Sequence, residues 1–185
     1  EKVKSMAVAD LDNNGDMEII ANSYYYVNVW NHDGTKYSGW PLYFSTPLYG
    51  ELSIADVDNN GFKDIIIADR YGSIKVLKKD ATPVAGWPKT MDVSSLEFRG
   101  PISVADLDND GKVELVARAS NPGVMGGKIW VLRNDGAIVP GWPQVTSHPG
   151  RAPASIADID GDGNFEVITG GLYVDPSNGA FSGAI

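Results

Sequence analysis

Bulky and small residues alternate just before each of four acidic segments in the chain. In the first of these stretches Met6 and Val8 alternate with Ala7 and Ala9. A period of two predicts a β-strand rather than a helix. One face of such a strand carries only Ser or Ala, which suits a close approach to a neighbouring sheet or to a narrow axis.

Further apolar stretches follow each acidic segment. Runs rich in β-branched residues, typical of buried strands, lie at residues 19–20, 65–67, 115–116 and 167–168. A third strand is predicted at residues 27–30, 74–77 and 129–132. A turn then leads into a fourth strand that includes Gly-Trp-Pro, at residues 39–41, 86–88 and 141–143. Because proline cannot donate to a ladder, we expect this strand at a sheet edge. No segment shows a sustained helical period, so the pattern predicts an all-β protein.

The acidic segment is an internal repeat. Its leading residues are Asp10, Asp56, Asp106 and Asp158, at spacings of 46, 50 and 52 residues. Four short antiparallel strands in a unit of about fifty residues are typical of a β-propeller blade. We therefore predict blades at approximately residues 1–46, 47–96, 97–148 and 149–185, of which the last is incomplete because no Gly-Trp-Pro follows its final turn.

Each acidic segment forms a nine-residue loop with oxygen-bearing side chains at positions 1, 3, 5 and 9 and glycine at position 6. In chain order, loops 1 to 4 are residues 10–18, 56–64, 106–114 and 158–166. Alternate oxygens in a tight loop converge on one point, and glycine tolerates the positive φ of a sharp turn. Position 7 varies in chemistry, as expected where only its backbone carbonyl binds. Oxygen ligands in this number favour Ca²⁺ over zinc, copper or Mg²⁺.

The sequence thus predicts about four Ca²⁺ ions, one per loop. The predicted ligands are Asp10, Asp12, Asn14, Asp16, Glu18, Asp56, Asp58, Asn60, Phe62, Asp64, Asp106, Asp108, Asp110, Lys112, Glu114, Asp158, Asp160, Asp162, Asn164 and Glu166.

Two alternatives to this metal site are a hairpin turn and an EF-hand. Asp, Asn and Gly are common in turns that only cap a hairpin, but fourfold recurrence at one spacing disfavours that reading. An EF-hand needs a glutamate at position 12 and flanking helices. Here the flanks are predicted strands, and position 12 is never a glutamate but Ala21, Ile67, Ala117 or Thr169. Both observations exclude an EF-hand, and the predicted strands also disfavour helical dockerin-type loops.

Charge and composition fit this interpretation. The net charge is −9, and 14 of the 24 acidic residues are predicted ligand side chains. Four Ca²⁺ ions would bring the formal charge to −1, so we expect calcium to contribute to folding. The acidic balance argues against a nucleic-acid partner. No apolar run is long enough for a membrane helix, and the absence of cysteine excludes disulfides and thiol catalysis within this stretch.

The sequence Val-Ala-Asp-Leu-Asp-Asn-Asn-Gly at residues 8–15, with its three counterparts, resembles the calcium loop of FG-GAP repeats, also called VCBS-type repeats. The resemblance covers nearly the whole chain. It implies the propeller of integrin α subunits and of bacterial secreted or cell-surface proteins, with Ca²⁺ held through positions 1, 3, 5, 7 and 9 between the first two strands of a blade. Such propellers have seven or eight blades. We therefore expect this chain to be a fragment of a longer protein, or to close a ring by self-association.

Several other residues invite a functional interpretation. The recurrent tryptophans are expected to pack between strands or blades rather than to stack on sugars, and the tyrosine cluster is expected at a partly buried strand end rather than in a carbohydrate site. Neither histidine stands in a catalytic motif. Two arginines precede first strands and are expected to pair with nearby acids. These residues are Trp40, Trp87, Trp142, Tyr24, Tyr25, Tyr26, His32, His148, Arg99 and Arg151.

The leading functional hypothesis is a non-catalytic binding, adhesion or scaffold domain of an extracellular protein, either secreted or on the cell surface. Protein or glycan ligands would bind its variable loops, including an insertion at residues 120–127. One alternative is an enzyme similar to calcium-dependent polysaccharide lyases. Another is a structural subunit of an extracellular assembly. The extracellular location follows from calcium, because sites of this kind need ambient calcium of about 10⁻⁴–10⁻³ M.

Overall fold

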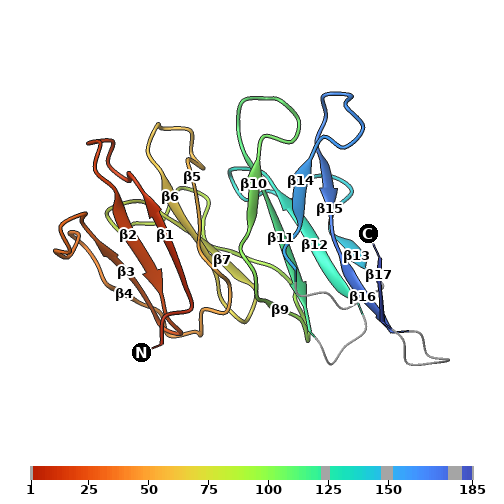
Figure 1. Ribbon diagram of the computed structural model, residues 1–185, viewed down its shortest axis with the longest axis horizontal. Coiled ribbons are helices and arrows are strands. Elements are labelled where there is room, and N and C mark those ends of the chain that lie inside the picture. Colours follow the sequence, from red (N-terminus) through yellow and green to blue (C-terminus); the bar gives the residue numbers. More distant parts are fainter. Residues whose placement is uncertain (1, 122–125, 147–151, 175–180, 185) are drawn as a thin grey trace.

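The computed structural model describes residues 2–121, 126–146, 152–174 and 181–184, and these residues form strands and turns without any helix. Within these ranges no helix could span a membrane. Four-stranded antiparallel sheets stand side by side in chain order (Figure 1), and the all-β, propeller-like fold predicted from the sequence is confirmed.

Sheets 1 and 2 have the same plan. Sheet 1 consists of β1 (Ser5–Ala9), β2 (Glu18–Asn22), β3 (Tyr26–Trp30) and β4 (Leu42–Tyr43), paired in that order. Sheet 2 repeats the order with β5 (Ser53–Ala55), β6 (Asp64–Ala68), β7 (Ser73–Leu77) and β8 (Lys89–Thr90). The last strand is an edge in each, as expected from the sequence.

Sheet 3 consists of β10 (Ser103–Ala105), β11 (Glu114–Ser120), β12 (Gly127–Leu132) and β13 (Gln144–Thr146), with a fifth strand, β9 (Glu97–Phe98), paired to the end of β11. The sequence did not predict β9. The insertion at residues 120–127 begins at the last residue of the long β11, and β9 pairs with the final two residues of this strand, Ala119 and Ser120.

The fourth repeat contains two separate pairs of strands. These are β14 (Ser155–Ala157) with β15 (Glu166–Ile168), and β16 (Gly171–Val174) with β17 (Phe181–Ala184). The first strands of neighbouring repeats are in contact, β1 with β5, β5 with β10 and β10 with β14. These four strands therefore follow one another along the row (Figure 1).

Sheet 2 packs one face against sheet 1 and the other against sheet 3. In β6, Ile65 and Ile67 join a buried cluster with Ile20 of sheet 1. Ile66 points the other way and packs with Leu115 of sheet 3. All three isoleucines of β6 are fully buried. Burial on both faces explains why the second strands are nearly continuous hydrophobic runs.

The Gly-Trp-Pro segments lie before the fourth strands, not within them as the sequence analysis expected. β4, β8 and β13 each begin at the residue after the proline. The glycines have φ of 89°, 89° and 92°, which an extended strand does not allow. The segment is therefore a turn that leads the chain into the edge strand.

The tryptophans of these turns join neighbouring sheets. The indole N–H of Trp40 donates to the backbone carbonyl of Lys79 at 2.8 Å, and that of Trp87 donates to the carbonyl of Asn134 at 3.0 Å. Both rings are buried. The interpretation of these two tryptophans as packing between blades is confirmed.

Candidate metal centres

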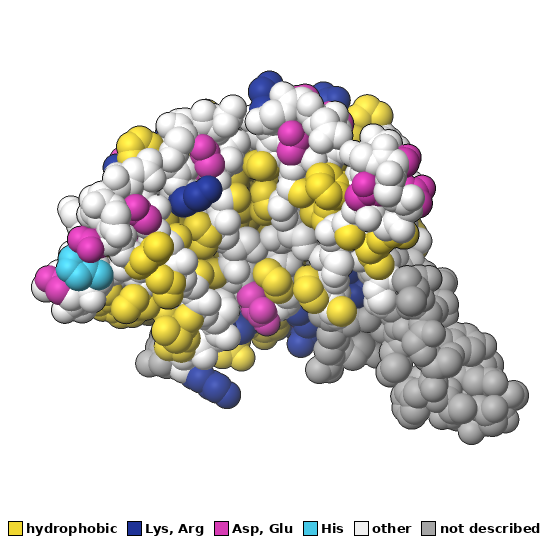
Figure 2. All heavy atoms as spheres, turned by 45° about the horizontal axis from the view of Figure 1, so that its top comes forward, with side chains coloured by type: hydrophobic (Ala, Val, Ile, Leu, Met, Phe, Trp, Pro, Cys, Tyr) yellow, Lys and Arg dark blue, Asp and Glu magenta, His cyan; other side chains and the backbone are white. Residues whose placement is uncertain are grey.

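Each nine-residue loop joins the first and second strands of its repeat, and all four loops project from the same edge of the row of sheets, at the top in Figure 1. Figure 2 turns this edge forward and shows acidic side chains along the rim, with hydrophobic side chains gathered between the projecting loops.

The aspartate at position 1 organises the loop from inside. In loop 1 the carboxylate of Asp10 accepts the backbone N–H groups of Asn14 at 3.2 Å and Gly15 at 2.9 Å. Desolvation acts against ionisation, but these bonds and others from the loop outweigh it and lower the pKa of Asp10. The position 1 aspartates of loops 2, 3 and 4 accept the corresponding glycine N–H at 2.7, 2.9 and 2.9 Å.

The acid at position 9 lies at the start of the second strand and points back under the loop. The carboxylate of Glu18 accepts the N–H of Leu11 at 2.9 Å, and Asp64 accepts that of Val57 at 2.9 Å. Burial, together with the nearby carboxylates of Asp58 and Asp56, raises the pKa of Asp64 to about 6. Glu114 in loop 3 has a raised pKa for the same reasons.

The aspartate at position 3 supplies the best test of whether a cation fits. Oδ1 of Asp12 and Oδ1 of Asp58 are buried and accept no hydrogen bond. A buried acceptor without a partner is costly. Bound Ca²⁺ would satisfy these oxygens, so the donor set fits the metal that the sequence predicts.

Positions 1, 3 and 9 meet in every loop. Their carboxylate oxygens lie within 4.8 Å of one another, in the groups Asp10, Asp12, Glu18; Asp56, Asp58, Asp64; Asp106, Asp108, Glu114; and Asp158, Asp160, Glu166. Oxygens bound to one Ca²⁺ ion at about 2.3–2.6 Å can be at most about 5 Å apart. The spacing is therefore compatible with a single ion in each loop.

The side chains at position 5 are directed towards the loop backbone. Asn14 accepts the N–H of Asp16 at 2.7 Å, and Asn60 accepts that of Phe62 at 2.8 Å. Asp110 and Asp162 make the same contact with position 7 and do not belong to the groups of three carboxylates. Ligation by position 5 and by the carbonyls of Asp16, Phe62, Lys112 and Asn164 stays a prediction.

Position 4 is a feature that the sequence analysis missed. Asn13, Asn59 and Asn109 have φ of 61°, 56° and 57°, and Gly161 takes the position in loop 4 with φ of 79°. Among residues with a side chain, asparagine tolerates this left-handed conformation unusually well. The recurrence of Asn or Gly at position 4 is the signal that could have revealed it.

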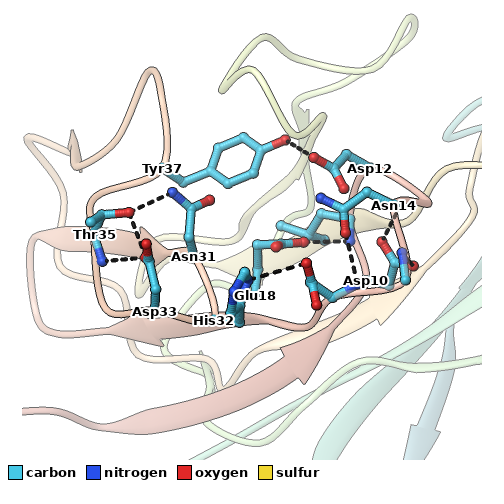
Figure 3. Close-up of polar contacts among 12 residues, drawn as sticks. Asp10, Asp12, Asn14, Glu18, Asn31, His32, Asp33, Thr35 and Tyr37 are labelled. Atoms are coloured by element: carbon cyan, nitrogen blue, oxygen red, sulfur yellow. Dashed lines mark hydrogen bonds and ion pairs between the residues drawn. The ribbon is translucent and has the colours of Figure 1, made fainter.

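Two further side chains contact the position 3 aspartates. The hydroxyl of Tyr37 donates to Oδ2 of Asp12 at 3.2 Å (Figure 3), and burial together with Asp12 raises the pKa of Tyr37 to about 12. In loop 2, Nζ of Lys78 lies 3.1 Å from Oδ2 of Asp58. These contacts hold Oδ2 of each aspartate and leave Oδ1 free for a cation.

The remaining candidate residues lie outside the metal clusters. Exposed His32 is 3.4 Å from Oδ2 of Asp16. Arg99 pairs with the buried Glu97, so the expected pairing of Arg99 with an acid is confirmed. Glu97 also binds Arg70 at 2.8 Å. Tyr24 and Tyr25 are 44% and 36% exposed. Tyr26 opens β3 and lies 5.2 Å from Tyr43, measured between ring centroids. His148 and Arg151 lie outside the described residues.

Comparison with known proteins identifies the repeat. A family model described as FG-GAP-like repeat matches residues 56–117 and 106–169, more than half of the chain. The chain belongs to the FG-GAP-like repeat family. The resemblance to FG-GAP repeats seen in the sequence is thus confirmed. No curated protein matches the sequence.

Solved structures share the fold of this FG-GAP repeat chain. A crystal structure of BBS1N in complex with ARL6DN, soaked with lead, has a TM-score of 0.63 at 12% identity, covering 96% of this chain and 54% of that one. A crystal of the complex soaked with mercury gives a TM-score of 0.55 at 15% identity, over 82% and 42%. A protein of unknown function from Bacteroides caccae gives 0.50 at 9%, over 99% and 60%. The chain spans about half the length of these structures.

Proposed function

We propose that this FG-GAP repeat chain is a calcium-stabilised binding or scaffold domain of a secreted or cell-surface protein. The observation that carries the proposal is the convergence of three carboxylates within 4.8 Å in each of four loops. Buried oxygens of Asp12 and Asp58 that accept no hydrogen bond support it. The repeat family and the propeller-like fold favour a binding or scaffold role over catalysis.

Positions 1, 3 and 9 would hold the ion, with the predicted oxygens at positions 5 and 7 completing its shell. Bound Ca²⁺ supplies charge neutralisation. The chain positions the carboxylates beforehand through the N–H groups of Gly15 and Leu11 in loop 1 and their counterparts elsewhere. Without a cation, repulsion among the carboxylates would oppose the closed loop. Calcium binding would therefore stabilise the folded chain by mass action.

The proposed location outside the cell follows from the affinity expected of such exposed loops. Extracellular calcium modules bind at about 10⁻⁴–10⁻³ M, far above the calcium concentrations sensed by cytosolic EF-hand proteins. Loops of this affinity would be filled outside the cell, where they could keep the domain rigid.

One face of sheet 1 is a candidate surface for further blades or for self-association. Met6 and Val8 on this face are 64% and 61% exposed. Val8 pairs with Ile19 in sheet 1 as Ile54 pairs with Ile65 in sheet 2, so Val8 and Ile54 are equivalent. Two residues earlier on the same face, Met6 is therefore equivalent to Leu52. Leu52 is only 9% exposed, because sheet 1 covers it. The free face of sheet 1 thus matches a face that is buried between sheets elsewhere in the molecule.

The experiment is a calorimetric titration of calcium into protein stripped of metal with EDTA. We expect close to four ions per chain, with much weaker binding of Mg²⁺. Asp58→Asn should remove one ion, whereas Asp33→Asn, at an exposed turn acid outside the loops, should remove none. Absence of calcium binding, or equal stoichiometry in both variants and the wild type, would overturn the proposal.

Two alternatives have their own tests. Depolymerisation of an acidic polysaccharide by the purified protein would favour a lyase-like enzyme. Calcium-dependent formation of a ring or larger particle would favour a structural subunit of an extracellular assembly.

A further inference from the structure

The asparagine at position 4 reaches from one metal loop to the next. In loop 1 the side-chain amide of Asn13 donates to the backbone carbonyl of Gly61 in loop 2 at 2.8 Å. In loop 3 the amide of Asn109 donates to the carbonyl of Gly163 in loop 4 at 3.3 Å. Each acceptor is the position 6 glycine of its loop. The two bonds are equivalent and join the loops of neighbouring repeats.

The peptide that accepts this bond also holds a predicted calcium ligand. The carbonyl of Gly61 and the N–H of Phe62 belong to one rigid peptide unit. That N–H donates to Oδ1 of Asn60, the position 5 oxygen of loop 2, at 2.8 Å. In loop 4 the peptide between Gly163 and Asn164 does the same for Asp162, also at 2.8 Å. The amide of one loop thus fixes the group that orients an oxygen in the next loop.

Hydrogen bonds in such a chain polarise and strengthen one another. The bond from Asn13 holds the carbonyl end of the Gly61–Phe62 peptide, and the bond to Asn60 holds its N–H end. Any change in loop 1 that moves Asn13 therefore acts on the position 5 oxygen of loop 2. Asn13 itself lies between Asp12 and Asn14, two predicted ligands of the ion in loop 1.

We propose that Asn13 and Asn109 are positioning residues that couple the calcium sites in pairs, loop 1 with loop 2 and loop 3 with loop 4. The proposal rests on the proposed function, that these loops bind calcium. Because the bond holds the position 6 peptide of the second loop in place, calcium that orders the first loop should raise the affinity of the second. Coupling between two sites is reciprocal, so the rise in affinity is the same in both directions.

Asn59 provides the contrast within the molecule. It stands at position 4 of loop 2 with φ of 56°, close to the 61° of Asn13. Among the described residues its amide makes no hydrogen bond to Gly111 of loop 3. The coupling is therefore pairwise and does not run through all four loops.

The test compares Asn13→Gly with Asn59→Gly. Both variants remove an exposed side-chain amide and keep a residue that tolerates positive φ, as Gly161 does in loop 4 with φ of 79°. The N–H groups of Gly15, Gly61 and Gly111 donate to the position 1 carboxylates of their own loops. Their amide signals in nuclear magnetic resonance spectra report calcium binding to each loop separately.

The midpoint of a signal is the calcium concentration at half of its change. In Asn13→Gly we expect the midpoint of the Gly61 signal to rise about fivefold and that of the Gly111 signal to stay unchanged. In Asn59→Gly the midpoint of Gly111 should stay at its wild-type value. An unchanged Gly61 midpoint in Asn13→Gly would overturn the coupling, and so would an equal rise for Gly111 in Asn59→Gly, which would indicate backbone flexibility instead. If no glycine signal of the wild type responds to calcium, the proposed function itself fails, which is a different result.

Discussion

Asp64 carries the strongest electrostatic perturbation among the loop carboxylates. It is 1% exposed, and burial with two neighbouring aspartates raises its pKa to about 6. The unfolded chain has the ordinary aspartate pKa of about 3.9. The folded, metal-free protein therefore binds more protons than the unfolded chain between these two values. The stability of the metal-free protein should rise as the pH falls through 6.

This pH dependence can be measured by denaturant unfolding in EDTA at pH 7 and pH 5. We expect the wild type to be more stable at pH 5 than at pH 7. Asp64→Asn keeps an acceptor for the N–H of Val57 and removes the titrating carboxyl. The increase in stability from pH 7 to pH 5 should therefore be smaller in this variant than in the wild type. An equal gain in the variant and the wild type would show that Asp64 does not carry the effect.

At the scale of elements, the turns that contain Gly39 and Gly86 lock sheets 1 and 2 to the sheet that follows each of them. A Cβ atom built on Gly86 would lie 2.6 Å from the backbone carbonyl oxygen of Asp135 in the following sheet. The buried indole of Trp87 bonds the same turn through Asn134. Glycine is needed here both for its φ and for the close approach.

Gly86→Ala should therefore destabilise the chain by about 2–4 kcal/mol, from left-handed strain together with overpacking. Gly34→Ala is the matched control, since Gly34 has φ of 83° and no atom within 4 Å of its Cβ position among the described residues. It should cost only the strain, about 1–2 kcal/mol. Chemical denaturation in saturating calcium measures the free energy of unfolding of both variants. Equal losses in the two variants would mean that the contact with Asp135 does not matter.

The sequence predicted the repeating elements better than the connections between them. The first three strands of each sheet lie where their hydrophobic periods placed them, because burial on one or two faces dictates those periods. The edge strands were misplaced by about three residues, since the left-handed φ of Gly39, Gly86 and Gly141 leaves no period in the sequence. β9 was missed because a pairing of two residues depends on the length of β11, a tertiary feature.

In the loops, too, local features could be predicted from the sequence, whereas contacts between distant segments could not. Spacing alone identified the oxygens of positions 1, 3 and 9 that the fold brings together. Tyr37 and Lys78 contact position 3 from the turn after the third strand, and no local pattern links them to the loops. The bond from Asn13 to Gly61 crosses between repeats 48 residues apart and depends on how the sheets stack.

At the scale of the whole molecule, the acidic loops lie along one edge of a row of sheets held together by apolar faces, at the top in Figure 1. Most of the negative charge is thus concentrated where four cations would neutralise it. The sheets alone can pack, but repulsion within and between neighbouring loops would work against that packing. Calcium should therefore act on the cooperative stability of the molecule and not only on the loops.

The most direct test of calcium as a structural component is a thermal melt with and without EDTA. At millimolar calcium and dissociation constants of about 10⁻⁴ M, four sites would together stabilise the fold by about 5–6 kcal/mol. For a chain of this size that shifts the midpoint by on the order of 10 °C or more. We expect EDTA to lower the midpoint by this amount, and excess Ca²⁺ but not Mg²⁺ to restore it. Identical midpoints with and without EDTA would contradict the account.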